Sequence, residues 1–281
     1  MSRIGVIGSG TMGNGIAHVF ALYNHKVTLH DIDKDAIARA MDSIKINLSR
    51  QLKAEKINTE QMNNCLNNIS TSNNLDELVE MDLVIEAATE NFDIKSKIFD
   101  SLDRICDSKT ILATNTSSIS IDKIALSTSR PGKIIGMHFM NPVPVMKLVE
   151  VINGEKTTDE TTDFIVTLSK EIGKIPVECN DSPGFVSNRI LMPMINESAF
   201  CFMEGVASAE GIDKIMKLGM GHPMGPLKLA DLIGIDVCLY IMEVLHNDFG
   251  DDKYRPCPIL KEMVDKGDLG CKTGKGFYSY D

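Results

Sequence analysis

A histidine and a glutamate in two neighbouring apolar runs are the residues best suited to acid-base chemistry. His138 lies in the first run and Glu150 in the second, with the turn-like sequence Asn-Pro-Val-Pro at 141–144 between them. We expect two paired strands centred near Pro144, so that His138 faces Glu150. A carboxylate beside an imidazole fixes its tautomer, and the other ring nitrogen can then exchange a proton with a substrate hydroxyl or carbonyl group. The alternative is a core histidine satisfied by a glutamate at a strand edge.

A G-x-G-x-x-G motif follows the first apolar run and opens an amphipathic segment. Glycines in this position let the backbone approach a pyrophosphate at the positive N-terminus of a helix. Asp31 ends the second apolar run, where a carboxylate can accept hydrogen bonds from both ribose hydroxyl groups of an adenosine. Asp31 would repel a 2′-phosphate, so the pattern predicts NAD as the cofactor rather than NADP; a glycine turn without a ligand is the alternative. The motif residues that we expect to bind NAD are Gly8, Ser9, Gly10, Thr11, Met12 and Gly13.

A polar segment, Thr-Asn-Thr-Ser-Ser at 114–118, follows another apolar run. Its hydroxyl and amide groups are expected at the carboxyl edge of a sheet, where open α/β folds bind ligands. A plain helix cap is the other interpretation. The remaining histidines show no metal-ligand spacing, so we predict no metal site.

Alternating segments indicate the elements that must position these residues. Runs rich in valine and isoleucine alternate with helical segments in the first part of the chain, which predicts a Rossmann-type, doubly wound parallel sheet. After residue 180 the pattern becomes helical, with Ser182 as a plausible N-cap and Pro183 at the first helical position. We therefore expect an α/β fold with an NAD-binding domain at 1–180 and an all-helical domain at 181–281. The helical patterns of the second domain cover residues 185–203, 209–218, 225–248 and 258–266.

Charge and cysteine content restrict the class of protein. The 281 residues carry a formal net charge of -10, which argues against binding to nucleic acids or anionic membranes. The seven cysteines form no C-x-x-C pair, and reduced thiols fit a cytoplasmic protein. No signal peptide or membrane span is visible.

These motifs together resemble the 3-hydroxyacyl-CoA dehydrogenase family, and most nearly its short bacterial 3-hydroxybutyryl-CoA members, over essentially the whole chain. The most specific stretches are Asp-Ser-Pro-Gly-Phe-Val-Ser-Asn-Arg at 181–189, His-Phe-Met-Asn-Pro at 138–142 with Glu150, Asn-Thr-Ser-Ser at 115–118 and Lys-Thr-Gly-Lys-Gly-Phe-Tyr at 272–278. The resemblance implies interconversion of (S)-3-hydroxybutyryl-CoA and acetoacetyl-CoA with NAD(H), the hydride passing between substrate C3 and the nicotinamide.

The resemblance also implies roles for particular residues. His138 would exchange the hydroxyl proton, Glu150 would orient it, and Ser117 and Asn188 would position the substrate. Further cofactor contacts are implied for Glu90, Lys95, Asn115, Ser117, Asn141 and Lys272. Basic residues for the CoA phosphates would be Arg50, Lys53 and Lys56, although a helix with this spacing and Glu55 is also typical of a solvated face.

The resemblance further implies a homodimer that pairs through the helical domain, since a small apolar domain gains from such burial. Two alternatives to an acyl-CoA substrate remain open. One is a dehydrogenase of a free hydroxy acid or polyol. The other is a non-catalytic structural protein derived from this family, which would be under no pressure to keep Ser117, His138, Glu150 and Asn188; all four are present.

Overall fold

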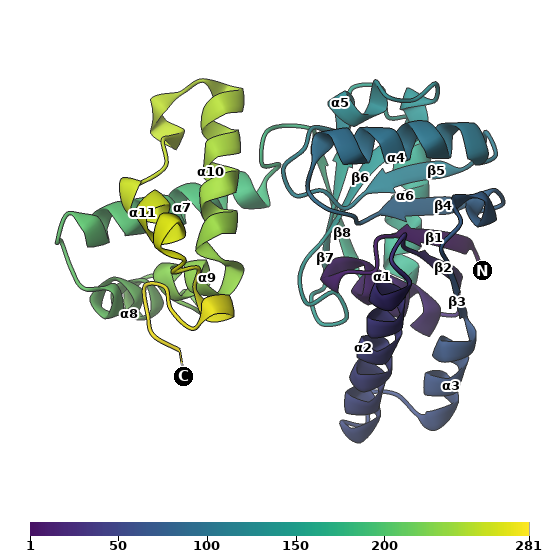
Figure 1. Cartoon of the computed structure of the whole chain (residues 1–281), viewed down its shortest axis with the longest axis horizontal. Coiled ribbons are helices and arrows are strands. Elements are labelled where there is room, and N and C mark those ends of the chain that lie inside the picture. The colour runs from purple at the N-terminus through teal and green to yellow at the C-terminus, as the bar shows by residue number, and fades with distance from the viewer. Residues whose placement is uncertain (281) are drawn as a thin grey trace. The chain divides into compact units, whose positions relative to one another are not determined.

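The computed structural model describes residues 1–280, which form two compact units that divide between Asp181 and Ser182. The first unit is a sheet with helices on both faces, and the second is helical (Figure 1). The predicted fold class is therefore confirmed. Each unit has its own buried apolar cluster.

One eight-stranded sheet, in the order β3-β2-β1-β4-β5-β6-β7-β8, forms the centre of the first unit. All neighbouring strands are parallel except β6 and β7, which are antiparallel. The chain leaves β1 toward one edge and β4 toward the other, which makes the junction of these strands the switch point of a Rossmann-type sheet. The strands are β1 (Arg3–Ile7), β2 (Lys26–His30), β3 (Ile69–Ser72), β4 (Leu83–Glu86), β5 (Ile111–Thr114), β6 (Ile134–Phe139), β7 (Leu148–Asn153) and β8 (Ile175–Asn180).

The central strands are mostly apolar because helices cover both faces of a parallel sheet. On one face, side chains such as Ile85 and Ala113 join a cluster with helices α1, α2, α3 and α6. Neighbouring side chains such as Val84 and Leu112 point to the other face and are also fully buried. The helices of this unit are α1 (Thr11–Leu22), α2 (Lys34–Lys53), α3 (Thr59–Asn67), η1 (Leu75–Leu78), α4 (Phe92–Ile105), α5 (Ile121–Ala125), η2 (Pro131–Lys133) and α6 (Asp159–Glu171).

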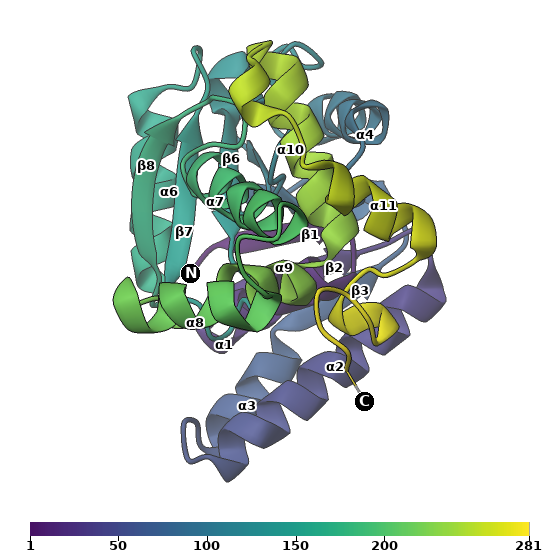
Figure 2. The same ribbon diagram turned by 90° about the vertical axis from the view of Figure 1, so that its left-hand side faces the viewer.

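Helices α2 and α3 extend beyond the sheet as a pair, as Figure 2 shows. The α2 helix has 20 residues, more than a crossover between adjacent strands needs, and only four of them are buried. An asparagine capping box at Asn58 and Gln61 starts α3. The two helices therefore form an excursion from the sheet.

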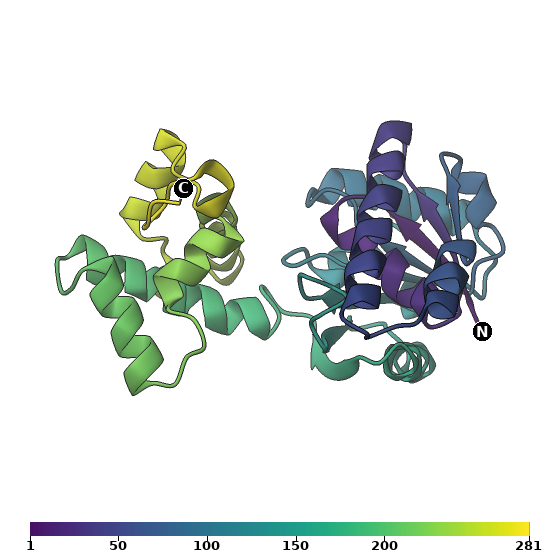
Figure 3. The ribbon, with the colours of Figure 1, turned by 90° about the horizontal axis from the view of Figure 1, so that it is seen from below.

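The second unit consists of helices joined by loops, coloured green to yellow in Figure 3. Its core cluster joins α7, α9, α10 and α11 and includes Ile195, Cys238 and Leu260. None of the described helices is long and apolar enough to cross a membrane. The helices are α7 (Ser187–Met203), α8 (Ala209–Gly219), α9 (Pro226–Ile233), α10 (Ile235–Phe249), η3 (Asp252–Tyr254), α11 (Pro258–Lys266) and η4 (Cys271–Thr273).

Two expectations for the helical unit are wrong. Helix α7 begins at Ser187, not after a Ser182 cap, because Gly184 and Phe185 have φ angles of 72° and 51°, which are incompatible with a right-handed helix. The pattern at 225–248 is two helices, since Gly234 has a φ of 108° and breaks the run between α9 and α10.

Candidate active site

Strands β6 and β7 bring His138 and Glu150 together. The two residues are directly opposite in the antiparallel register, and His138 Nδ1 lies 2.7 Å from Glu150 Oε2. Both are buried, with 7% and 4% of their surfaces exposed. The strand pairing expected from the turn at 141–144 is present. Because Nδ1 faces the carboxylate, Glu150 fixes the orientation of the imidazole ring.

The glycine-rich loop joins the end of β1 to the start of α1. Gly8 has a φ of 92°, and a Cβ atom there would lie 2.6 Å from the Ala87 carbonyl oxygen. A Cβ atom at Gly13 would lie 1.7 Å from the Gly8 oxygen, whereas Gly10 has no atom within 4 Å of that position. Gly10 is the N-cap of α1 and supplies no side-chain bond to the helix. The loop therefore leaves an open approach to the positive end of α1, as a pyrophosphate requires.

Asp31 follows β2 and lies against the glycine-rich loop. Its Oδ2 accepts hydrogen bonds from the Ser9 N–H and hydroxyl group, both at 2.8 Å, and its Oδ1 accepts one from Asp33 N–H at 3.0 Å. Burial opposes ionisation, but these bonds outweigh it and hold the pKa of Asp31 below its usual value. A fixed, charged carboxylate beside an uncrowded glycine fits the adenosine half of NAD.

A polar network connects the carboxyl ends of β4 and β5. Glu90 Oε1 accepts hydrogen bonds from the Thr116 hydroxyl at 2.6 Å and from both the N–H and the hydroxyl groups of Ser117 and Ser118. Lys95 is 1% exposed, and its Nζ lies 2.7 Å from Glu86 and 3.4 Å from Glu90. The network fixes the segment that carries Ser117.

Glu86 is a residue of this site that the sequence analysis missed. It ends the apolar strand β4, is fully buried, and contacts Lys95, Thr114 and the Ala88 N–H. The available signal was an acidic residue in an otherwise apolar strand, which needs a charged or hydrogen-bonded partner nearby.

Asn115 connects the Ser117 segment to the His138 strand. Its side-chain oxygen accepts a hydrogen bond from Phe139 N–H at 2.9 Å, and its own N–H donates to the Glu86 carbonyl oxygen at 2.7 Å. Asn141 is exposed in the loop after β6. The structure therefore brings most of the predicted site residues to the carboxyl edge of one sheet.

Two predicted site residues belong to the helical unit. Asn188 is buried in the first turn of α7. Lys272 forms an ion pair with Asp236 of α10. Each is fixed by its own unit.

The predicted CoA-binding residues lie at the far end of α2. Arg50 and Lys53 belong to its last turn, and Lys56 follows in the connection to α3. All three are exposed, and the described residues provide no ion-pair partner for any of them. The dipole of a helix favours cations at its C-terminus. Stabilisation of α2 is therefore a second explanation for Arg50 and Lys53, beside the predicted binding of CoA phosphates.

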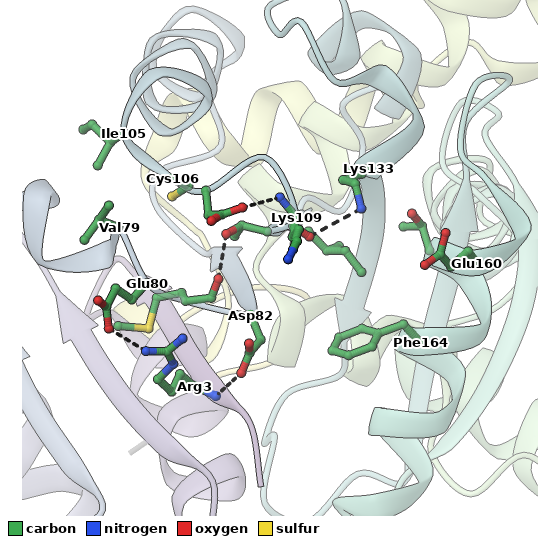
Figure 4. A pocket seen from close by; sticks show the side chains of 15 residues that line it. Arg3, Val79, Glu80, Asp82, Ile105, Cys106, Lys109, Lys133, Glu160 and Phe164 are labelled. Atoms are coloured by element: carbon green, nitrogen blue, oxygen red, sulfur yellow. Dashed lines mark hydrogen bonds and ion pairs between the residues drawn. The ribbon is translucent and has the colours of Figure 1, made fainter.

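A hollow of about 890 Å³ lies at the opposite, amino edge of the sheet (Figure 4). It is lined by the starts of β1, β4 and β5, and Arg3 in it bonds to Glu80 and Asp82. Ligands in open α/β folds bind at the carboxyl ends of the strands, so this hollow is not the dinucleotide site.

Comparison with known proteins identifies the family. Residues 3–182 match the family model of the 3-hydroxyacyl-CoA dehydrogenase NAD-binding domain, and residues 184–280 match the model of its C-terminal domain. The chain is 52% identical over 281 residues to the probable 3-hydroxybutyryl-CoA dehydrogenase of Bacillus subtilis, covering 100% of this chain and 98% of the relative. It is 51% identical over 279 residues to the 3-hydroxybutyryl-CoA dehydrogenase of Clostridioides difficile, covering 99% of each.

A solved structure is similarly close. The crystal structure of (S)-3-hydroxybutyryl-CoA dehydrogenase from Ralstonia eutropha matches with a TM-score of 0.97 and 49% identity, covering 100% of this chain and 99% of that one. The chain therefore belongs to the 3-hydroxyacyl-CoA dehydrogenase family, and it is an NAD-dependent oxidoreductase.

Proposed function

We propose that this enzyme interconverts (S)-3-hydroxybutyryl-CoA and acetoacetyl-CoA, with His138 as general acid and base and Glu150 as its partner. The observation that carries the proposal is the 2.7 Å contact between His138 Nδ1 and Glu150 Oε2. The choice of substrate is supported by relatives that share about half of their residues with this chain and are named 3-hydroxybutyryl-CoA dehydrogenase. The sequence motifs that resemble this family imply the same substrate.

Proton transfer is the step that the dyad would perform. In the oxidation direction His138 Nε2 takes the proton of the substrate C3 hydroxyl group while the hydride leaves C3. The Nδ1–H of the resulting imidazolium would donate a hydrogen bond to Glu150, and the negative charge of this buried carboxylate would stabilise the cation. In the reduction direction the same nitrogen returns the proton to the carbonyl oxygen. Acid-base help of this kind contributes roughly 10²- to 10⁴-fold in rate.

NAD supplies the hydride acceptor when it is bound, and the residues at the carboxyl edge fit it. The open approach at Gly10 suits the pyrophosphate, and Asp31 suits the adenosine ribose. We extend the proposal to Glu90, Asn115 and Asn141 at the nicotinamide half, with Lys272 contributed by the helical domain. Since Lys95 is buried and bonded to Glu86, it would act on the cofactor site through Glu90.

Substrate positioning falls to Ser117 and Asn188 in this proposal. The Ser117 hydroxyl is held next to the site by Glu90 at 3.2 Å, which supports a fixed position for it. The CoA phosphates would bind Arg50, Lys53 and Lys56, whose exposed and unpaired cations are available for them.

We also propose a homodimer that pairs through the helical domain. An apolar hollow of about 370 Å³ between α7 and α8 is lined by Met194, Val206, Ile215 and Met216, and the Val206 and Ile215 side chains are exposed. Burial of these apolar side chains against a second copy would support the dimer. All seven cysteines are free, which suits the cytoplasm as the location.

The test is NADH absorbance when the purified enzyme meets acetoacetyl-CoA, with free acetoacetate and NADPH as parallel controls. Rapid loss of absorbance only with NADH and the CoA ester is the expected result. Comparable loss with free acetoacetate would favour a free-acid dehydrogenase. No loss in any sample, with NADH binding intact, would favour a non-catalytic relative.

A further inference from the structure

Three charged side chains form a buried cluster between the carboxyl ends of β4 and β5. Lys95 Nζ bonds to both carboxylate oxygens of Glu86, at 2.7 and 2.9 Å, and lies 3.4 Å from Glu90. Glu86 is fully buried and Lys95 is 1% exposed. Lys95 is thus paired first with Glu86, and Glu90 is only its second partner.

The cluster carries one negative charge in surplus. Lys95, the Thr114 hydroxyl and the Ala88 N–H all donate hydrogen bonds to the Glu86 carboxylate. Burial opposes ionisation of Glu90, but the charge of Lys95 and the donors of residues 116–118 lower its pKa below the usual value. Two carboxylates therefore share one ammonium group.

The surplus charge resides on Glu90, at the edge that binds the cofactor. The Glu90 side chain is 28% exposed, whereas its two partners are closed off from solvent. In a Rossmann-type sheet the half built on β4, β5 and β6 takes the second mononucleotide of the dinucleotide, which in NAD is the nicotinamide half. The segment held by Glu90 also carries Ser117, and Asn115 ties it to the His138 strand.

The two redox states of the cofactor differ in charge at this end. The oxidised nicotinamide ring is positive, and the reduced ring is neutral. An anion fixed in a poorly hydrated site interacts with that difference more strongly than it would in water. We propose that the Glu86–Lys95–Glu90 cluster raises the affinity for NAD⁺ relative to NADH, and that Glu86 determines this preference by neutralising Lys95.

Dissociation constants for both cofactor forms test the proposal on the full chain without any acyl substrate. NADH binding is followed by its fluorescence, and NAD⁺ binding by its displacement of NADH. E86Q and E90Q each remove the surplus charge, so the ratio of the NAD⁺ to the NADH dissociation constant should rise roughly tenfold for each. K95M leaves two carboxylates without their cation, and the ratio should fall.

T114V is the matched control. It removes the hydrogen bond to Glu86 without changing any charge, so the ratio should stay at the wild-type value. A change with T114V as large as that with E86Q would overturn the proposal, because disturbance of the network would then explain the effect. A changed ratio in E90Q with a wild-type ratio in E86Q would also overturn the proposal. A direct contact of Glu90 with the cofactor would then explain the preference without Glu86.

Thermal unfolding of each variant shows whether it folds. If E86Q does not fold, the ratios of the dissociation constants in E90Q and K95M test the proposal. Ratios that change in opposite directions support it, and wild-type ratios in both variants overturn it. The inference rests on NAD binding and not on the acyl-CoA substrate. Wild-type protein that binds NADH but leaves acetoacetyl-CoA unreacted would defeat the proposed function while the ratio test still stands.

Discussion

The Asn115 side-chain oxygen accepts a hydrogen bond at 2.9 Å from the N–H of Phe139, the residue after His138. Strand β6 thus receives at this point a side-chain acceptor from the neighbouring βα loop. The same loop continues into Ser117, which is held by Glu90 in the connection between β4 and α4. The loop and the strand that carry the proposed substrate and proton-transfer groups are therefore fixed to each other directly.

Replacing Asn115 with alanine should weaken that connection. N115A leaves the Phe139 N–H without its acceptor, which costs about 1–3 kcal/mol of unfolding free energy when a buried donor stays unsatisfied. Turnover should also fall, because the Ser117 segment loses its link to His138. Denaturant unfolding and the NADH assay measure both effects. N63A, at an exposed position of α3, is the control and should change neither; equal stability and turnover in N115A and N63A would contradict the idea.

His138 can be tested separately from cofactor binding. H138Q keeps a polar side chain of similar size but cannot accept a proton at neutral pH. We expect turnover to fall by roughly 10²- to 10⁴-fold with NADH affinity nearly unchanged. Turnover measured at saturating substrate, together with NADH fluorescence, separates the two effects. Unaltered turnover would remove His138 from the mechanism.

The role proposed for Glu150 should be visible in the pH dependence of kcat/KM. E150Q removes the anion that stabilises the imidazolium, so in the oxidation direction, where His138 acts as a base, the acidic limb of the kcat/KM profile should move to lower pH and the maximal rate should fall. E178Q, on the adjacent strand β8 at an exposed position, is the control and should keep the wild-type profile. Coincident profiles for E150Q and wild type would show that Glu150 has no electrostatic role.

The sequence predicted the contact between His138 and Glu150 and the tight glycine-rich turn because both depend on local patterns. The turn at 141–144 sets the register that puts His138 opposite Glu150, and the spacing of Gly8, Gly10 and Gly13 follows from one tight connection. Strand β3, with the polar sequence Ile-Ser-Thr-Ser, gave no such pattern. It forms because β2 offers it a free edge, which is a tertiary effect.

Contacts between distant residues could not be predicted from such patterns. Glu86 acquires its role only when Lys95 of α4 and Thr114 of β5 pack against it. The start of α7 was placed too early because nothing in the local sequence requires Phe185 to adopt a positive φ. The Phe185 side chain is buried, and burial against distant residues is a tertiary effect that the local sequence does not encode.

Two glycines of the cofactor loop should respond differently to alanine. G13A places a methyl group 1.7 Å from the Gly8 oxygen, so the loop itself must move and the protein should lose stability. G10A meets no atom within 4 Å and should fold normally, but its methyl group occupies the approach to the end of α1. Thermal unfolding and NADH fluorescence distinguish them. A G10A enzyme with wild-type NADH affinity would contradict the assignment of that approach to the pyrophosphate.

His18 should make folding stability depend on pH. It is fully buried in α1, the described residues give neither ring nitrogen a hydrogen-bond partner, and burial lowers its pKa to about 4. The unfolded chain takes up a proton near pH 6.5 while the folded protein does not, so stability is lost as the pH falls from about 6.5 to 4. The loss attributable to His18 is about 3 kcal/mol at the lower end. H18L cannot be protonated and should remove that part of the pH dependence.

Denaturant unfolding of wild type and H18L at pH 7 and pH 4.5 measures the difference. The two proteins should have similar unfolding free energies at pH 7, and the variant should lose less stability on acidification. The remaining loss in H18L has a source in His25 and His30, whose pKa values are also lowered by burial. Equal losses in both proteins would mean that His18 is protonated in the folded protein as readily as in the unfolded chain.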